Sequence, residues 1–250
     1  MIKYEKKDGI GIIYLNRPDK RNALHPDLIR SLKGQLNSCK NDDDVKILII
    51  TGEGKSFCAG ADLGYLNDLR NYSDIENEKD SESLAELFLN IYEFPKPVIA
   101  AVNGPAIAGG CGLAGVCDFI VADYNKAKFG YSEVKIGFLP AIVSIFLIKK
   151  IGEGNAKQLL MSGEIIDAKR AYEMGFANYL ADDSLEYSIE HAKKLMQNSE
   201  FSMAFTKKMV NSISGLSVKY AVDYCVRLNT ISRSSEDFRN GLENFLNKKS

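Results

Sequence analysis

Two segments of small residues have the composition needed to bind an oxygen through backbone amides. They are CAGAD at residues 58–62 and AIAGGCG at residues 106–112, and each follows a predicted strand. Small side chains leave N–H groups open to a ligand, and the second segment is expected to begin a helix, whose N-terminal end favours negative charge. Two amides that converge on one oxygen form an oxyanion hole. Small residues also suit close backbone packing, so each segment alone leaves both interpretations open.

Titratable residues outside these segments offer few catalytic candidates. Glu133 lies among aromatic and apolar neighbours in KFGYSEV at 128–134, and spacing alone favours a solvated surface carboxylate. His25 precedes Pro26 at an expected helix start and is interpreted as a cap-region residue. His191 lies in a polar helical pattern and is expected to be exposed. No further ligands stand at suitable spacing, so the sequence predicts no metal site.

The segment GEGKS at 52–56 follows a strand and ends like a phosphate-binding loop. That motif requires a glycine where this chain has Ile49, and it requires a helix after Ser56, where this chain continues FCAG. Nucleotide hydrolysis is therefore excluded.

The elements that must position the two segments alternate between strands and helices. A nearly continuous apolar run at 45–51 is typical of a strand covered on both faces. Further strands are expected at 10–15, 98–102 and 119–122, with a helix from Pro26 and a crossover helix within 104–116. This alternation predicts an α/β core with a parallel sheet and right-handed crossovers.

The later part of the chain differs in kind, because it lacks strand-like runs after Asp167. Asp167 is expected to cap a helix that ends at Gly175, and the helical segments that follow are 185–196, 203–213, 218–231 and 236–245. The chain is therefore divided into a core, 1–194, and a helical C-terminal region, 195–250. The polar segment 71–86 is interpreted as a mobile loop or frayed helix, with a lid beside the site as the alternative.

Length and composition match a soluble globular protein. At about 150 residues per domain, 250 residues give one domain, with room for an appendage. The chain carries 32 basic and 33 acidic residues, a balance that lacks the charge expected for nucleic-acid or membrane partners. Five scattered cysteines without a C-x-x-C pair favour a reducing compartment, and the N-terminus is charged where a signal peptide is apolar. The sequence therefore predicts a cytoplasmic protein.

Four ordered motifs carry a family resemblance. They are NRPDKRNAL at 16–24, FCAGADL at 57–63, PKPVIAAVNG at 95–104 and AGGCGL at 108–113, and the similarity continues through EVKIG at 133–137 to the end of the chain. Together they resemble the crotonase superfamily, the enoyl-CoA hydratase/isomerase proteins. The resemblance implies an α/β fold, a spiral of repeated ββα units with a helical C-terminal region that builds homotrimers or homohexamers.

The resemblance also implies an acyl-CoA thioester as the substrate, with no separate cofactor because CoA is part of that substrate. It places the two oxyanion donors at the amides of Ala61 and Gly109, and one of the family's two catalytic glutamates at Glu133. Family positions that contact CoA fall on Arg21, Ala23, Ala59, Asp62, Leu63, Phe245 and Lys248. Of these, the last two often reach CoA from a neighbouring subunit.

One departure from the family pattern bears on the reaction. A two-glutamate hydratase carries its other glutamate three residues after the oxyanion glycine, where this chain has Gly112. The stretch GFLPAIVS at 137–144 also departs from the usual glycine-rich form. Both features resemble a subgroup described as methylglutaconyl-CoA hydratases, in which a distal carboxylate of the substrate would help to orient water.

Several reactions are compatible with these features. The preferred hypothesis is hydration of a short or branched 2-enoyl-CoA, 3-methylglutaconyl-CoA among them, with Glu133 as the acid/base. The first alternative is a 3-enoyl to 2-enoyl isomerase, which needs one base and fits Gly112; decarboxylation of a carboxylated acyl thioester is another. A non-catalytic CoA- or RNA-binding paralogue is disfavoured by Glu133, by the two small-residue segments and by the neutral charge.

Overall fold

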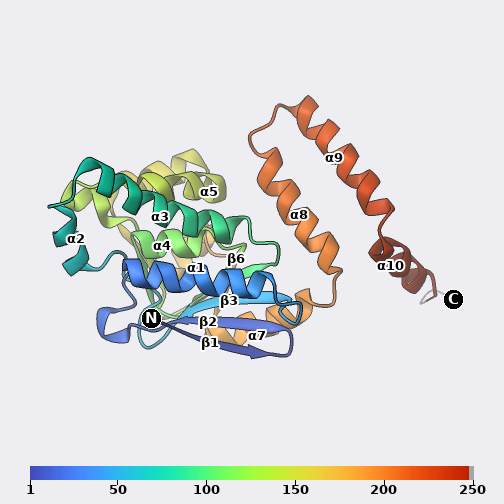
Figure 1. Cartoon of the computed structure of the whole chain (residues 1–250), viewed down its shortest axis with the longest axis horizontal. Coiled ribbons are helices and arrows are strands. Elements are labelled where there is room, and N and C mark those ends of the chain that lie inside the picture. Colours follow the sequence, from blue (N-terminus) through green and yellow to red (C-terminus); the bar gives the residue numbers. More distant parts are fainter. Residues whose placement is uncertain (248–250) are drawn as a thin grey trace.

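The computed structural model describes residues 1–247, in which two sheets are surrounded by helices (Figure 1). The main sheet has the strand order β1-β2-β3-β4-β6-β9, and β1 pairs antiparallel with β2 while the neighbours that follow pair parallel. Its strands are β1 (Ile2–Lys7), β2 (Ile10–Leu15), β3 (Ile47–Gly52), β4 (Val98–Val102), β6 (Phe119–Asp123) and β9 (Tyr179–Ala181). The predicted parallel α/β core is confirmed.

Helices cover both faces of this sheet. One face packs against α1 (Pro26–Lys40), α3 (Asp74–Tyr92) and α4 (Gly109–Gly115), and the other packs against α7 (Ser184–Leu195). Along β3, Leu48 and Ile50 point to the first face and Ile47 and Ile49 to the second, and all four are fully buried. The prediction that this strand is covered on both faces is confirmed.

A second, smaller sheet includes the start of the segment 106–112 and contacts the segment 58–62 through a bridge between Ala106 and Cys58. It contains β5 (Pro105–Ile107), β7 (Lys128–Gly130) and β8 (Ile165–Asp167), with β5 parallel to β7 and β7 antiparallel to β8. The single crossover helix expected within 104–116 is therefore wrong in part. Residues 105–107 form a strand because β7 and Cys58 supply their backbone partners, and the helix begins only at Gly109.

From residue 74 onward the polar segment 71–86 belongs to a regular helix, so the expectation of a mobile loop or a frayed helix is wrong there. Ser73 begins α3 with a capping box, since its Oγ accepts from the Glu76 N–H and Glu76 Oε2 accepts from the Ser73 N–H at 2.8 Å. The helix is held by buried apolar residues at its far end, Leu87, Phe88 and Ile91. The expectation of a loop or frayed helix was wrong because these buried residues come directly after the polar segment from which it was made.

The remaining elements of the core connect these layers. They are η1 (Pro18–Lys20), α2 (Leu63–Leu69), η2 (Ser132–Ile136), α5 (Ala141–Ser162) and α6 (Ala168–Glu173). Asp167 caps α6 as predicted, because its Oδ1 accepts from the Arg170 N–H at 2.8 Å. His25 is the N-cap of α1, as its sequence position indicated.

The last three helices form a C-terminal arm, defined here as residues 200–247, which extends away from the core (Figure 1). It consists of α8 (Glu200–Ile213), α9 (Val218–Arg233) and α10 (Glu236–Asn247). Lys207 attaches α8 to the core through Asp118 at 2.7 Å, and Asn211 donates to the Tyr92 carbonyl at 2.9 Å. The division at residue 194 stays a prediction. Nowhere in residues 1–247 is a helix long and apolar enough to cross a membrane.

Candidate active site

The two small-residue segments lie against each other. Cys58 donates to the Pro105 carbonyl at 3.1 Å and accepts from the Ile107 N–H at 2.9 Å. A Cβ added to Gly110 would lie 2.1 Å from the Cys58 carbonyl oxygen, and one added to Gly60 would lie 3.0 Å from the Ile107 oxygen. Gly60 also has φ +91°, which favours glycine. Close packing therefore requires glycine at both positions, and it brings the two backbones together.

The amides of Ala61 and Gly109 flank this contact and remain available. Their neighbours are occupied, since Asp62 donates to the Leu24 carbonyl at 2.8 Å and Ala108 donates to the Gly130 carbonyl at 2.7 Å. Within residues 1–247, neither the Ala61 nor the Gly109 N–H has a protein acceptor, and both residues are half-buried. Both interpretations of the small residues thus hold: the glycines allow close packing, and the packing leaves two N–H groups open.

Ala108 holds the backbone in an unusual conformation next to one of these donors. Its φ of +51° is rare for a residue with a Cβ, and it is the N-cap of α4. Its hydrogen bond to Gly130 fixes this conformation, and Gly109 follows as the first residue of the helix. Strain of this kind persists where the surrounding structure enforces it, often at functional sites.

Glu133 is buried close to the start of α4. The pairing of β5 with β7 places Gly130 beside Ile107, and the chain reaches Glu133 three residues later, in η2. Burial raises the pKa of Glu133. Burial also raises the pKa of the Cys111 thiol, and the nearby charge of Glu133 adds to that effect. Its Oε2 is buried without a hydrogen-bond partner within the described part of the chain. The surface interpretation from spacing alone is therefore wrong.

Two residues that sequence reasoning left out hold the first motif in place. Arg17 pairs with Asp62 at 2.8 Å and also donates to the Ala23 carbonyl at 2.6 Å. The Asn22 amide accepts from the Arg17 N–H and donates to the Ser56 carbonyl at 2.8 Å, so it joins the motif to the loop before Cys58. Asn22 is fully buried with φ +56°, and no local sequence pattern distinguishes such a residue from an ordinary turn asparagine.

Two open amides and a buried carboxylate with a raised pKa are the groups needed to stabilise a developing negative charge on an oxygen and to move a proton. Such chemistry agrees with the comparison to known proteins, in which the enoyl-CoA hydratase/isomerase family model matches residues 5–250. The chain belongs to the enoyl-CoA hydratase/isomerase family. It is accordingly an enzyme with hydratase-type activity on acyl-CoA thioesters, and the resemblance to the superfamily is confirmed.

Individual relatives cover nearly the whole chain. A Thermus thermophilus relative, whose name also places it among enoyl-CoA hydratases, is 37% identical over 251 residues, covering 100% of this chain and 98% of its own. Crotonyl-CoA hydratase of Syntrophomonas wolfei is 32% identical over 249 residues, covering 98% and 94%. The crystal structure of an enoyl-CoA hydratase from Shewanella pealeana has a TM-score of 0.94 at 29% identity, covering 99% of this chain and 93% of that one. The fold is the crotonase fold.

Most of the predicted CoA-contacting positions of this hydratase/isomerase family member gather beside the open amides. Arg21 is exposed and its carbonyl accepts from the Ala59 N–H at 3.0 Å, while Ala23 is buried next to Leu24, which pairs with Ala61. Leu63 begins α2 and is 81% exposed. These side chains remain candidates for CoA contact.

Two other predicted contacts, Asp62 and Phe245, are placed differently. The Asp62 carboxylate is engaged by Arg17, which holds its pKa below the ordinary value, and it also caps α2 by accepting from the Gly64 N–H at 2.9 Å. Both the carboxylate and the backbone groups of Asp62 are therefore engaged within the chain, since its N–H donates to the Leu24 carbonyl and its carbonyl accepts from the Leu66 N–H. Phe245 lies in α10, which Figure 1 shows at the end of the arm away from α1 and α2. Lys248 lies outside the described residues.

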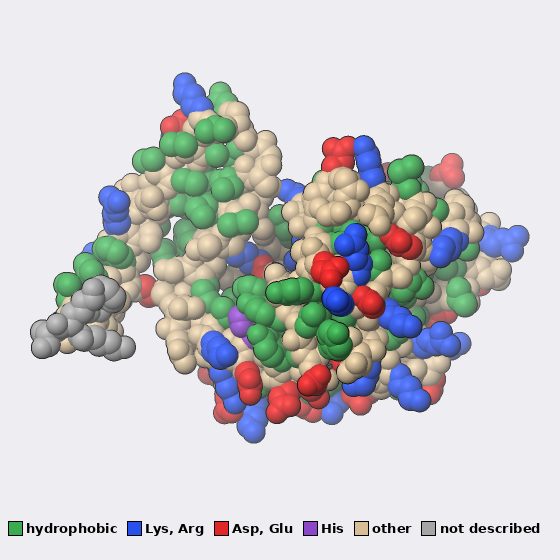
Figure 2. Space-filling view, turned by 180° about the vertical axis from the view of Figure 1, so that it is seen from behind, with side chains coloured by type: hydrophobic (Ala, Val, Ile, Leu, Met, Phe, Trp, Pro, Cys, Tyr) green, Lys and Arg blue, Asp and Glu red, His purple; other side chains and the backbone are tan. Residues whose placement is uncertain are grey.

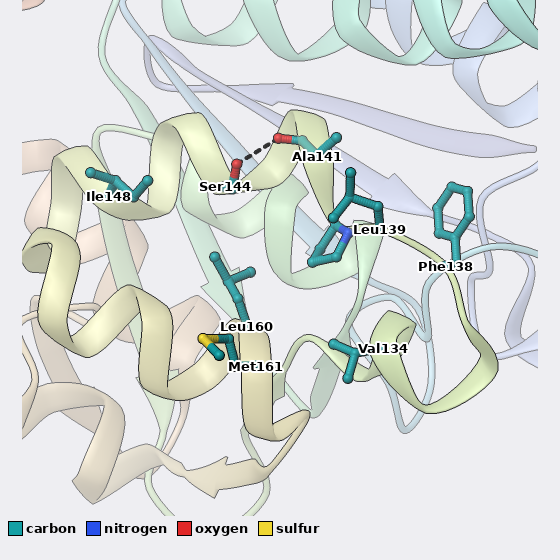
Figure 3. Close-up of a pocket in the computed structure, with 9 residues that line it drawn as sticks. Val134, Phe138, Leu139, Ala141, Ser144, Ile148, Leu160 and Met161 are labelled. Carbon is teal, nitrogen blue, oxygen red and sulfur yellow. Dashed lines mark hydrogen bonds between the residues drawn. The ribbon is translucent and has the colours of Figure 1, made fainter.

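A separate apolar groove of about 670 Å³ runs between η2 and α5, and Figure 3 shows its lining. It is lined by Val134, Phe138, Leu139, Pro140, Ala141, Ser144, Ile148, Leu160 and Met161. Phe138, Leu139 and Met161 are 61%, 73% and 75% exposed. None of the three catalytic candidates lines this groove, although Val134 directly follows Glu133 in the chain.

Proposed function

We propose that this protein adds water across the double bond of a short or branched 2-enoyl-CoA, with Glu133 as the only acid/base. The observations that carry the proposal are the buried Oε2 of Glu133, which has no hydrogen-bond partner in the described residues, and the two open amides of Ala61 and Gly109. A relative named for crotonyl-CoA supports a short acyl chain. The 3-methylglutaconyl thioester, suggested by Gly112 and by the stretch 137–144, stays a candidate substrate.

In the proposed reaction, the ionised Glu133 removes a proton from water as the water oxygen bonds to Cβ of the thioester. The electrons of the double bond move toward the carbonyl, and the N–H groups of Ala61 and Gly109 stabilise the charge on its oxygen. Each such donor contributes roughly 3 kcal/mol in the transition state. Glu133, now protonated, then gives its proton to Cα. One water has been added, and the carboxylate is restored.

The raised pKa of Glu133 suits both steps. Burial disfavours the ionised form, so the carboxylate is a stronger base toward water than an exposed one and is then a usable acid toward Cα. The reaction begins from the ionised form, so kcat/KM should rise with pH and level off above the Glu133 pKa. The midpoint of this rise in kcat/KM should lie at a pH above 4.5, the ordinary pKa of a glutamate.

Isomerisation of a 3-enoyl to a 2-enoyl thioester is the second candidate. It is favoured by Gly112, which leaves one carboxylate at the site, because moving a proton between Cα and Cγ needs one base. In that case Glu133 takes the proton from Cα, the same two amides hold the enolate oxygen, and Glu133 returns the proton to Cγ.

Thioester assays separate these reactions. Purified protein is given 2-enoyl, 3-enoyl and 3-methylglutaconyl thioesters; hydration removes the absorbance of the conjugated thioester, whereas isomerisation creates it. Glu133→Gln should lower kcat by about 100- to 10,000-fold and leave CoA binding intact. Glu153→Gln is the control, because Glu153 is an exposed glutamate paired with Lys157 on α5. Wild-type turnover in the Glu133 variant would remove Glu133 from the mechanism.

We also propose that three copies assemble through their arms, as a homotrimer or as a homohexamer of two trimers. Figure 2 shows hydrophobic side chains gathered on the protruding helices. On α9 these include Val218, Val222 and Val226, which are 81%, 54% and 57% exposed. The groove between η2 and α5 is a second exposed apolar surface, so a neighbouring copy's arm would cover what each copy leaves exposed. A cytoplasmic location stays a prediction.

A further inference from the structure

Position 112 has no room for a side chain. Gly112 lies one helical turn after the Gly109 donor, so a side chain there would project from the same face of α4. A Cβ added at this position would lie 2.3 Å from Val143 Cγ1 and 3.2 Å from both Val143 Cβ and Phe88 Cε2. A contact of 2.3 Å is far inside van der Waals distance, so Val143 would have to move before even an alanine was accommodated.

Neither neighbour can yield this space easily. Val143 is 4% exposed on the first turn of α5, and Phe88 is fully buried on α3. The Phe88 ring packs edge-on against Phe146, with centroids 6.2 Å apart. A β-branched valine in a helix has one strongly preferred rotamer, so it cannot turn away. One turn further along the same face of α4, a Cβ on Gly115 would meet the Phe176 ring at an ordinary 3.5 Å, so on this face the restriction ends after position 112.

We infer that Val143 is a specificity-determining residue of the site. Its methyl groups fill the volume that an acidic side chain at position 112 would need, and together with Phe88 they form an apolar wall facing the first turn of α4. The lack of a second acid at this position therefore depends on the packing of α3, α4 and α5 as well as on the glycine itself. This inference rests on the proposed function, since it explains why Glu133 acts alone.

The contact between Gly112 and Val143 predicts that substitutions at the two positions have coupled effects on the melting temperature. A double-mutant cycle measures this coupling. Gly112→Glu alone should lower the melting temperature by roughly 10 °C, because it overpacks the wall and buries a charge. Val143→Gly alone should lower it by less. The variant with both changes should melt above Gly112→Glu alone, because the space vacated by Val143 receives the new side chain. Rescue of this sign supports the inference.

The control replaces the neighbouring helix residue. Ile142→Gly introduces the same helix-destabilising glycine into α5 but opens no space at position 112. Combined with Gly112→Glu, it should give additive losses and no rescue. Additive losses for Val143→Gly as well, or a wild-type melting temperature for Gly112→Glu, would overturn the inference. These measurements need no substrate, so they do not depend on the proposed reaction.

A second readout tests specificity and not only packing. Relative to Val143→Gly, the variant with both changes should alter the ratio of 2-enoyl hydration to 3-enoyl isomerisation by about 10-fold or more, because a second acid then stands at the site. An unchanged ratio would show that the pair does not reach the reacting atoms and would overturn the inference. Failure of the proposed function is recognisable separately, because the wild-type protein would then not hydrate the 2-enoyl thioester.

Discussion

The core and the C-terminal arm use their apolar side chains in opposite ways. In the core, Leu48, Ile50 and their neighbours on the sheet are fully buried, and the candidate site lies within this packed region. In the arm, Val218 and Tyr220 are 81% and 67% exposed, although α9 is a regular helix of 16 residues. The core can therefore hold its reaction geometry within one chain, whereas the arm has apolar surface that only another surface can cover.

Polar contacts cross the junction between the two regions. Lys207 of α8 binds Asp118 and also donates to the Ile91 carbonyl at 3.2 Å, so a few directional contacts fix where the arm leaves the core. Burial raises the pKa of Asp118, and the charge of Lys207 opposes that effect. A cavity of about 1160 Å³ remains between α8 and the core. The comparison therefore predicts that site geometry and assembly can be disturbed separately.

Among the changes that separate the core from the arm, the largest effect should come from the contact between the two site loops. In Gly110→Ala, the new Cβ would lie 2.1 Å from the Cys58 carbonyl oxygen, so the loops must separate and the Gly109 amide must move. We expect kcat to fall by about 100-fold, the effect of losing one oxyanion donor, and stability to fall by about 1–3 kcal/mol. Steady-state kinetics and thermal unfolding measure both.

The matched control for this change is Gly34→Ala, since Gly34 lies within α1 and a Cβ there meets nothing within 4 Å. Replacing an open helical glycine by alanine should stabilise the protein slightly and leave kcat unchanged. Assembly should be the same in both variants. Normal kcat in Gly110→Ala would show that the loop contact does not set the donor geometry.

The second effect should break the arm and leave the core intact. Val226→Asp places a charge on the exposed apolar face of α9, so the proposed trimer should dissociate to a lower native mass. The melting transition of the core should be retained, because Val226 contributes nothing to its buried clusters. Asn229→Asp, which adds the same charge at an exposed polar position of α9, is the control. An unchanged native mass of Val226→Asp relative to this control would contradict the proposed interface.

The same contrast explains how much of the molecule is predictable from its sequence. Long apolar runs such as β3 and β4 and the amphipathic helices α1 and α7 follow from local patterns, and the structure places them as expected. The strands β5, β7, β8 and β9 have three residues each, too few for a repeating pattern, and β9 contradicts the expectation that no strand follows Asp167. They form because a partner backbone is present, which only the tertiary fold supplies.

The candidate site also has parts that the sequence predicts and parts that it does not. The segments around Ala61 and Gly109 are recognisable because backbone donors are left open only where several consecutive residues are small. Glu133 is recognisable only through the family motif. The contact between Gly112 and Val143 joins residues that are 31 positions apart, and each alone is unremarkable. The outward position expected for His191 was wrong: it is half-buried, because a helix that reads as polar packs one side against the sheet.

The smallest predicted effect concerns this histidine, at the edge where the core approaches the arm. His191 lies 5.1 Å from the Phe119 ring and 4.8 Å from the Tyr179 ring, and Phe119 also lines the cavity beneath α8. Its Nε2 is buried without a hydrogen-bond partner in the described residues. Burial lowers the pKa of His191 below its ordinary value of 6.5, and the charge of Lys194 adds to the effect.

The sign of the pH dependence follows from proton counting. As the pH falls below 6.5, the unfolded chain gains a proton on His191 that the folded protein resists, so folded stability should decrease. His191→Phe keeps the aromatic packing and removes the proton, so its melting temperature should fall less than that of the wild type between about pH 7.5 and about pH 5.5. The difference should be modest, because the ring is only half-buried and solvent stabilises part of the charge. If the melting temperatures of the two proteins changed in parallel with pH, this edge of the core would already accommodate the charged ring. The junction would then be more open to water than its aromatic lining indicates.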